Sequence, residues 1–115
     1  MRYKHFYEPV YQASVHYVYD CGHEEANKKF KRIFGIDGHS TEKHGGQCVE
    51  AINKSGNTEQ FIYTRKKDFY TLLHEIVHMV HHILTRRNVP ITETDSEAYA
   101  YYIEYWARVM WRNTK

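Results

Sequence analysis

Two histidines and a glutamate stand close together in the run His74-Glu75-Ile76-Val77-His78. In an α-helix, where each residue turns about 100°, residues four apart lie about 40° apart on one face and one turn apart. Two imidazoles in this arrangement can bind a single Zn²⁺ through their ring nitrogens. Glu75 lies between them, where its carboxylate can take a proton from a water molecule that the metal acidifies. The H-E-x-x-H pattern therefore predicts a zinc site that activates water.

A plainer interpretation makes His74 and His78 surface histidines of an amphipathic helix. The neighbouring residues favour the zinc site instead. Leu72, Leu73 and Ile76 are apolar and would bury one flank of the helix. This leaves the histidine side of the helix for a cleft.

A catalytic zinc takes three protein ligands and keeps one position open. We expect Glu97 to be the third ligand, because an antiparallel second helix would bring its first turns near the end of the first helix. A competing interpretation is that Glu97 caps its own helix, since Thr94-Asp95-Ser96-Glu97 fits a capping box. Glu93 and Glu104 are the fallback candidates.

His81 lies two turns after His74 and on nearly the same face, so it can enter the cleft, support a ligand or be polar surface. His82 has a weaker claim. A structural zinc site would instead be closed by a fourth protein ligand. The candidates for that ligand are His81, His39, His44, Cys21 and Cys48.

The elements that must position these residues follow from hydrophobic periodicity. Apolar residues at helical spacing predict a helix from an N-cap at Asp68 to about Arg86, which the segment 88–90 ends. A second helix is predicted from about Ser96 to Arg112.

The first half of the chain predicts a strand over 10–19 and an amphipathic helix over 24–34. Strands over 47–53 and 58–65 are joined by a turn at 54–57 and form an antiparallel hairpin. The order β-α-β-β-α-α predicts one α+β domain over residues 1–115. In it, a small three-stranded sheet packs against the helix with the histidines and the C-terminal helix.

Composition narrows the function classes. The chain has 115 residues, of which 42% are hydrophobic and 26% charged, and a formal net charge of +2. This small charge makes nucleic acid an unexpected partner, and the basic clusters at 28–32 and 65–67 are predicted to be solvated faces. Two cysteines, with no apolar run typical of a signal peptide or membrane span, predict a cytoplasmic protein with free thiols and no membrane partner.

The motif, followed by Ser96-Glu97-Ala98-Tyr99-Ala100-Tyr101, resembles the gluzincin metallopeptidases. Glu97 follows His78 by 19 residues, similar to the short spacing of thermolysin-like peptidases. The size is similar to that of minigluzincins, and the Glu-Ala-x-Ala segment resembles ImmA/IrrE-type proteins and small phage-encoded metallopeptidases. The resemblance covers about residues 61–106.

This resemblance implies a zincin-like fold with His74, His78 and Glu97 as zinc ligands and Glu75 as the general base. It also implies that the strand at 58–65 is a sheet edge along which an extended peptide binds.

Tyr101 marks a departure from the family, because thermolysin-like enzymes keep an Asp there that orients a zinc-bound histidine. Tyr101 is therefore predicted to bond an imidazole or the transition-state oxyanion, or to be packed without a catalytic role. Tyr99, Tyr102 and Tyr105 are alternatives for stabilising the oxyanion.

The resulting hypothesis is zinc-dependent hydrolysis of peptide bonds by metal-activated water, with a peptide or protein as substrate. The alternative is a zinc-stabilised, non-catalytic binding or regulatory module of phage type, acting in the host cytoplasm. The sequence contains no signal for the substrate, the pathway or the oligomeric state.

Overall fold

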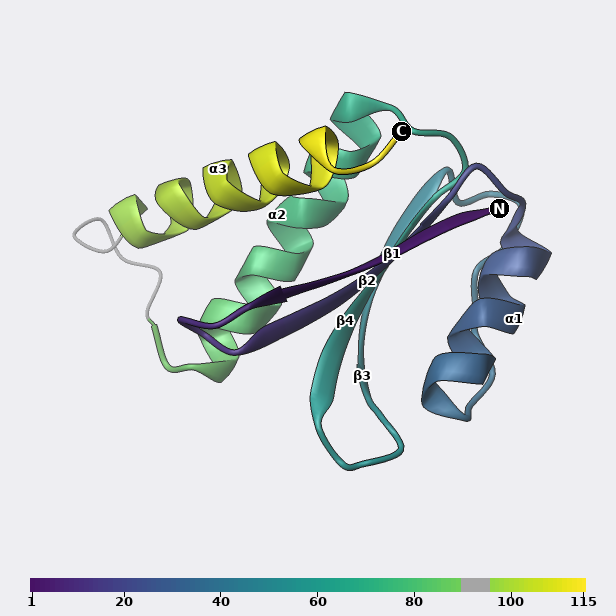
Figure 1. Ribbon diagram of the computed structural model, residues 1–115, viewed down its shortest axis with the longest axis horizontal. Helices are drawn as coiled ribbons and strands as arrows, with labels where there is room; N and C mark the ends of the chain where they lie inside the picture. Colours follow the sequence, from purple (N-terminus) through teal and green to yellow (C-terminus); the bar gives the residue numbers. More distant parts are fainter. Residues whose placement is uncertain (90–95) are drawn as a thin grey trace.

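Four strands form one mixed sheet in the order β1-β2-β4-β3 (Figure 1). The computed structural model describes residues 1–89 and 96–115. Its elements are β1 (Arg2–Glu8), β2 (Ala13–Tyr19), α1 (His23–Phe34), β3 (Gly46–Ile52), β4 (Thr58–Thr64), α2 (Phe69–Arg86) and α3 (Ser96–Arg112). Within the described part of the chain, no helix is long and apolar enough to cross a membrane.

The strand directions explain the connections. β1–β2 and β3–β4 are antiparallel pairs, whereas β2 and β4 run parallel. Parallel neighbours need a crossover, and the segment containing α1 supplies it. β1 and β3 are consequently the two edge strands.

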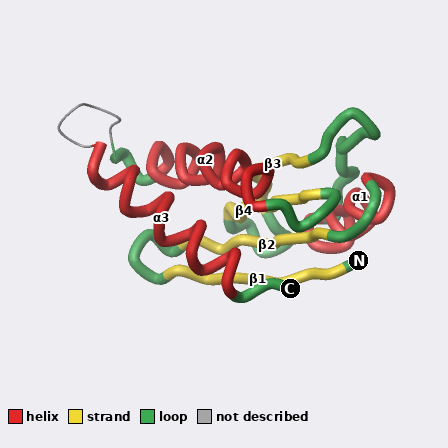
Figure 2. The backbone as a smooth tube through the Cα atoms, turned by 90° about the horizontal axis from the view of Figure 1, so that it is seen from above, coloured by secondary structure: helices red, strands yellow, loops and turns green. Residues whose placement is uncertain are grey.

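The helices cover both faces of this sheet (Figure 2). Because side chains alternate along a strand, β2 sends Val15 and Tyr17 into the larger core with α2 and α3. The same strand sends Val18 into a smaller core, where it packs with Phe30 and Phe34 of α1.

Helix α2 carries the histidine motif and begins where the sequence predicts. The Asp68 carboxylate caps it, accepting a hydrogen bond from the backbone N–H of Thr71 at 2.9 Å. Leu72, Ile76 and Ile83 are among the residues that it buries, at the spacing of one helical face. The prediction of this helix and its cap is confirmed.

The α+β class is also confirmed, but the predicted three-stranded sheet is incomplete. β1 was missed, and the strand predicted over 10–19 begins only at Ala13. Gln12 has φ of 54°, and the Glu8 carboxylate accepts hydrogen bonds from the backbone of Val10 and Tyr11. The segment before Ala13 is therefore a turn, although its β-branched and aromatic residues predict a strand.

The expectation that the strand at 58–65 is a sheet edge is wrong. β4 lies between β2 and β3 and pairs with both. The hairpin of β3 and β4 is present as predicted, so the edge on this side is β3.

Candidate metal centre

His74, Glu75 and His78 each offer a ligand atom, and these atoms all lie within 4.8 Å of one another. Both histidines are exposed on α2, with their ring centroids 4.9 Å apart. Their Nε2 atoms lie 3.3 Å apart. The helix therefore brings together the three residues of the motif.

The distance between the two nitrogens matches zinc coordination. Zn–N bonds are about 2.0–2.1 Å long, so two ligands of a tetrahedral ion lie about 3.3–3.4 Å apart. The Nε2 atoms of His74 and His78 lie at this separation without rearrangement. Because Glu75 is expected to act as the general base, the group supplies two of the three ligands of a catalytic zinc. His74 and His78 therefore fit two positions of the metal.

Glu75 differs from the two histidines because it is only 7% exposed and turns toward β3. Gly46 makes this approach possible: a Cβ added there would lie 2.8 Å from the Thr71 methyl group and 3.0 Å from Glu75 Oε2. Burial raises the pKa of Glu75 above its usual value, and the charges of nearby histidines oppose this rise. A raised carboxyl pKa suits a general base that works near neutral pH.

His44 is a further residue on this side of the molecule. It lies in the segment between α1 and β3, and its charge is one of those that act on Glu75. The backbone N–H of Thr41 donates to its Nδ1 at 3.2 Å, which leaves Nε2 as the remaining ring nitrogen. A metal-binding histidine normally donates from its other ring nitrogen, whereas Nδ1 of His44 accepts, so that a neutral ring in this position carries its proton on Nε2. The sequence suggested His44 only as one of several fourth ligands.

Glu97 is not in the group formed by the motif residues. It is exposed in the first turn of α3, and within the described ranges only Glu75 joins His74 and His78 at ligand distance. Thr94 and Asp95 of the possible capping box lie outside the described residues.

The fallback carboxylates are not in the group either. Glu104 accepts a hydrogen bond from Arg108 of its own helix at 3.1 Å, and its side chain is exposed. Glu93 lies outside the described residues.

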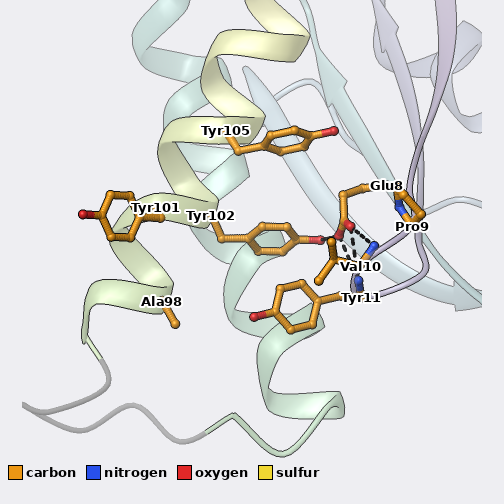
Figure 3. A pocket seen from close by; sticks show the side chains of 8 residues that line it. All are labelled: Glu8, Pro9, Val10, Tyr11, Ala98, Tyr101, Tyr102 and Tyr105. Atoms are coloured by element: carbon orange, nitrogen blue, oxygen red, sulfur yellow. Dashed lines mark hydrogen bonds between the residues drawn. The ribbon is translucent and has the colours of Figure 1, made fainter.

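The tyrosines of α3 are spread over different surroundings. Tyr101 is 67% exposed, and Figure 3 shows it directed away from Tyr102 and Tyr105. Tyr102 donates a hydrogen bond to Glu8 of β1. The Tyr99 hydroxyl lies 3.5 Å from Nδ1 of His81, and among residues 1–89 and 96–115 this is the one hydrogen bond between an α3 tyrosine and a histidine of α2.

The remaining candidates for a fourth ligand are not in the group formed by the motif residues, although the charge of Glu75 acts on Cys48. Cys48 and Cys21 are free thiols, and burial raises the pKa of both. Cys48 lies 3.9 Å from Nδ1 of His82, between β3 and α2. His39 is exposed.

Comparison of this chain with models of protein families, with curated proteins and with solved structures finds no match. The assignment of the site therefore rests on its own geometry.

Proposed function

We propose that this protein is a zinc-dependent hydrolase of peptide bonds with a zincin-like active site. His74 and His78 would hold the metal, and Glu75 would act as the general base. The observation that carries the proposal is the 3.3 Å separation of the two Nε2 atoms beside a buried carboxylate. When bound, Zn²⁺ is a Lewis acid that polarises a carbonyl group and acidifies water.

Glu75 is suited to moving a proton. Its burial against Gly46 excludes bulk water from one side of the carboxylate, while the exposed histidines leave the other side open to substrate. The carboxylate would take a proton from the attacking water and return it to the departing amine. Both transfers use the same oxygen atoms, so no second acid is required.

Two residues compete to be the third ligand. The family resemblance favours Glu97, which would have to approach from the start of α3. His44 is favoured by its charge, which acts on Glu75, although its ring would have to give up the hydrogen bond from Thr41 to bind a metal through Nδ1. Either would complete a set of three with one position open.

The substrate would lie along β3. This strand has β4 on one side, and in the described part of the chain its other side pairs with no strand. An unpaired edge offers backbone N–H and C=O groups to an extended peptide. Gly46 begins this strand and touches Glu75, so a peptide added there would pass beside the general base.

Replacing Glu75 by Gln tests the reaction. We expect Glu75→Gln to bind zinc like the wild type but to cleave a mixed peptide library about 10²- to 10⁴-fold more slowly, the usual contribution of a general base. Glu104→Gln, an exposed carboxylate on α3, is the matched control and should cleave normally. Equal cleavage by Glu75→Gln and the wild type would rule out this mechanism. A wild type that binds zinc and cleaves nothing would favour the non-catalytic binding module.

The third ligand is tested by comparing His44→Ala with Glu97→Ala. The variant that removes a ligand should lose zinc affinity by more than the roughly 10–100-fold that loss of an outer partner costs. The other should bind zinc like the wild type. Unchanged affinity in both variants would contradict the three-ligand site.

A further inference from the structure

A cavity of about 330 Å³ lies on the side of α3 that faces the β1–β2 turn (Figure 3). This volume is at the lower end of the roughly 300–1,000 Å³ usual for small-molecule sites. Tyrosines dominate its lining, and Glu8 lies among them. None of these residues belongs to the candidate metal centre.

Three of the tyrosines form an aromatic wall. The rings of Tyr11 and Tyr102 are 4.9 Å apart and steeply inclined, whereas those of Tyr102 and Tyr105 are 6.3 Å apart and nearly parallel. Figure 3 shows Tyr102 and Tyr105 extending from α3 on the side of Glu8, with Tyr11 beside Tyr102. Aromatic faces gathered in this way attract cations through their quadrupoles.

Glu8 places a negative charge at the base of this wall. It is only 4% exposed, and in the described part of the chain no ion pair includes it. Buried carboxylates are normally paired with a cation or strongly hydrogen-bonded. Here only hydrogen bonds compensate the charge, so the cavity keeps an electrostatic preference for a cation.

The hydrogen bonds of Glu8 determine which cation fits. Oε1 accepts from the Tyr102 hydroxyl at 2.6 Å and from the Tyr11 backbone N–H at 3.2 Å. Oε2 accepts from the backbone N–H groups of Val10 and Tyr11. Three donors therefore surround the carboxylate, and the Tyr11 N–H is shared between its two oxygens, so most of its roughly four acceptor positions are in use. Burial first, and then the bond to Glu8, raise the pKa of Tyr102 and keep its hydroxyl a donor.

We infer that this cavity binds a quaternary ammonium group, held by the faces of Tyr11, Tyr102 and Tyr105 and by the charge of Glu8. A primary ammonium carries three N–H groups, and Glu8 already accepts from three donors, so the carboxylate would satisfy these N–H groups poorly, which is costly. A trimethylammonium group has no N–H to satisfy and presents methyl groups to the rings. The group could be carried by a free quaternary ammonium compound such as choline or by a trimethylated lysine side chain.

Titration calorimetry with choline tests the inference against a neutral isostere. 3,3-Dimethyl-1-butanol has the same shape without the charge, and we expect it to bind at least about fivefold more weakly, because it forms no cation–π interaction. Ethanolamine should also bind more weakly than choline. A peptide that carries trimethyllysine is titrated in the same way. Whichever of the peptide and choline binds more tightly identifies the source of the quaternary ammonium group.

Variants of Tyr105 test the aromatic wall. Tyr105→Phe keeps the ring and should bind choline within about twofold of the wild type, whereas Tyr105→Leu should bind about three- to tenfold more weakly. Glu8→Gln should weaken choline binding more than dimethylbutanol binding. If Glu8→Gln does not fold, the Tyr105 pair decides. His78→Ala should leave choline binding unchanged, because the cavity lies apart from the metal centre.

Several results would overturn the inference. Equal binding of choline and dimethylbutanol would mean that the cavity recognises shape alone. Tighter binding of ethanolamine would mean that Glu8 still has a free acceptor. The site would be excluded if neither choline nor the trimethyllysine peptide binds at the highest soluble concentration. Equal affinity of Tyr105→Leu and Tyr105→Phe for choline would exclude it as well.

Discussion

Gly46 is the residue at which the edge strand meets the helix of the candidate metal centre. The Thr71 side chain, which faces the missing Cβ, is held in place because its hydroxyl donates to Asp68 at 2.8 Å. The Glu75 carboxylate is the other neighbour. A methyl group at residue 46 must therefore displace an anchored side chain or the proposed general base.

We predict that Gly46→Ala lowers the free energy of unfolding by about 1–3 kcal/mol, the usual cost of overpacking. It should also slow peptide cleavage while zinc still binds, because Glu75 moves. Gly45→Ala is the matched control, since nothing lies within 4 Å of a Cβ added at that residue. Denaturant unfolding measures both variants. Equal stability of the two would mean that β3 and α2 separate easily.

His16 is a buried histidine on the opposite face of the sheet, only 6% exposed. Tyr3 lies at hydrogen-bond distance from its Nδ1, and the Glu59 carboxylate from its Nε2. The His5 ring stacks on it at 4.2 Å, and Lys29 adds a repulsive charge. Burial lowers the pKa of His16, although the bond to Glu59 opposes this effect.

This lowered pKa predicts the pH dependence of stability. The unfolded chain protonates His16 near pH 6.5, before the folded chain does, so stability is lost as pH falls below about 6.5. One such group contributes a slope of at most about 1.4 kcal/mol per pH unit. In protein treated with a chelator to remove zinc, His16→Gln should reduce the slope of the unfolding free energy against pH between about pH 6.5 and 5. An unchanged slope would contradict the prediction.

Glu59 should act in a separate, more acidic range. Its partial burial raises its pKa, but its hydrogen bonds, first that from His16, lower the pKa below the usual value overall. Its contribution to stability is therefore lost only as pH falls below about 4.5. The two ranges can be distinguished in one titration.

Among the helices and strands, the sequence predicts those that a local pattern of residues determines. α2 has a capping aspartate and a continuous apolar face, so its start and its end agree with the structure. β1 has only Phe6 and Glu8 buried, because it is an edge strand with an exposed outer face. One apolar residue and one buried carboxylate do not make an alternating apolar pattern. The hydrogen bonds that Glu8 accepts from the following turn are local, but no pattern of apolar residues in the sequence indicates them.

Lys67 connects the two helices that follow the sheet. Its ammonium donates to the backbone carbonyls of Trp111 and Thr114 at the end of α3, and it lies 4.4 Å from the centre of the Trp111 ring. Nearby, the rings of Phe69 and Trp111 are 5.3 Å apart. Cations stabilise helix C-termini by bonding to their last carbonyls.

We predict that Lys67→Met destabilises the fold by about 1 kcal/mol, less than a fully buried charged hydrogen bond because Lys67 is partly exposed. Lys66→Met is the control, because Lys66 is exposed. Hydrogen exchange of the last turn of α3 should also accelerate in Lys67→Met alone. Matching exchange in the two variants would show that the lysine does not hold α3.

For the whole molecule, the position of α3 explains why the third ligand could not be predicted. α3 returns along α2, with Trp111 near Phe69 and Tyr99 near His81. The antiparallel arrangement follows from the short connection, but the register depends on packing between distant residues. Tyr99 contacts α2 at His81, which follows His78 in the chain. The spacing of residues in the sequence therefore does not by itself place Glu97 beside His74 and His78. The ligand role of Glu97 stays a prediction.

Removing the proposed zinc with a chelator tests how far the fold depends on the candidate site. His74 and His78 both lie on α2, while the main core joins α2, α3 and the sheet through buried apolar residues such as Ile76 and Trp106. We therefore predict that a chelator leaves the far-ultraviolet circular dichroism unchanged but lowers Tm. Zinc at 100 times its Kd should restore about 2.7 kcal/mol of stability by mass action. The variant with His74→Ala and His78→Ala should show no response to zinc. Unfolding of the wild type on chelation would instead indicate a closed structural site, which is the arrangement that the non-catalytic binding module requires.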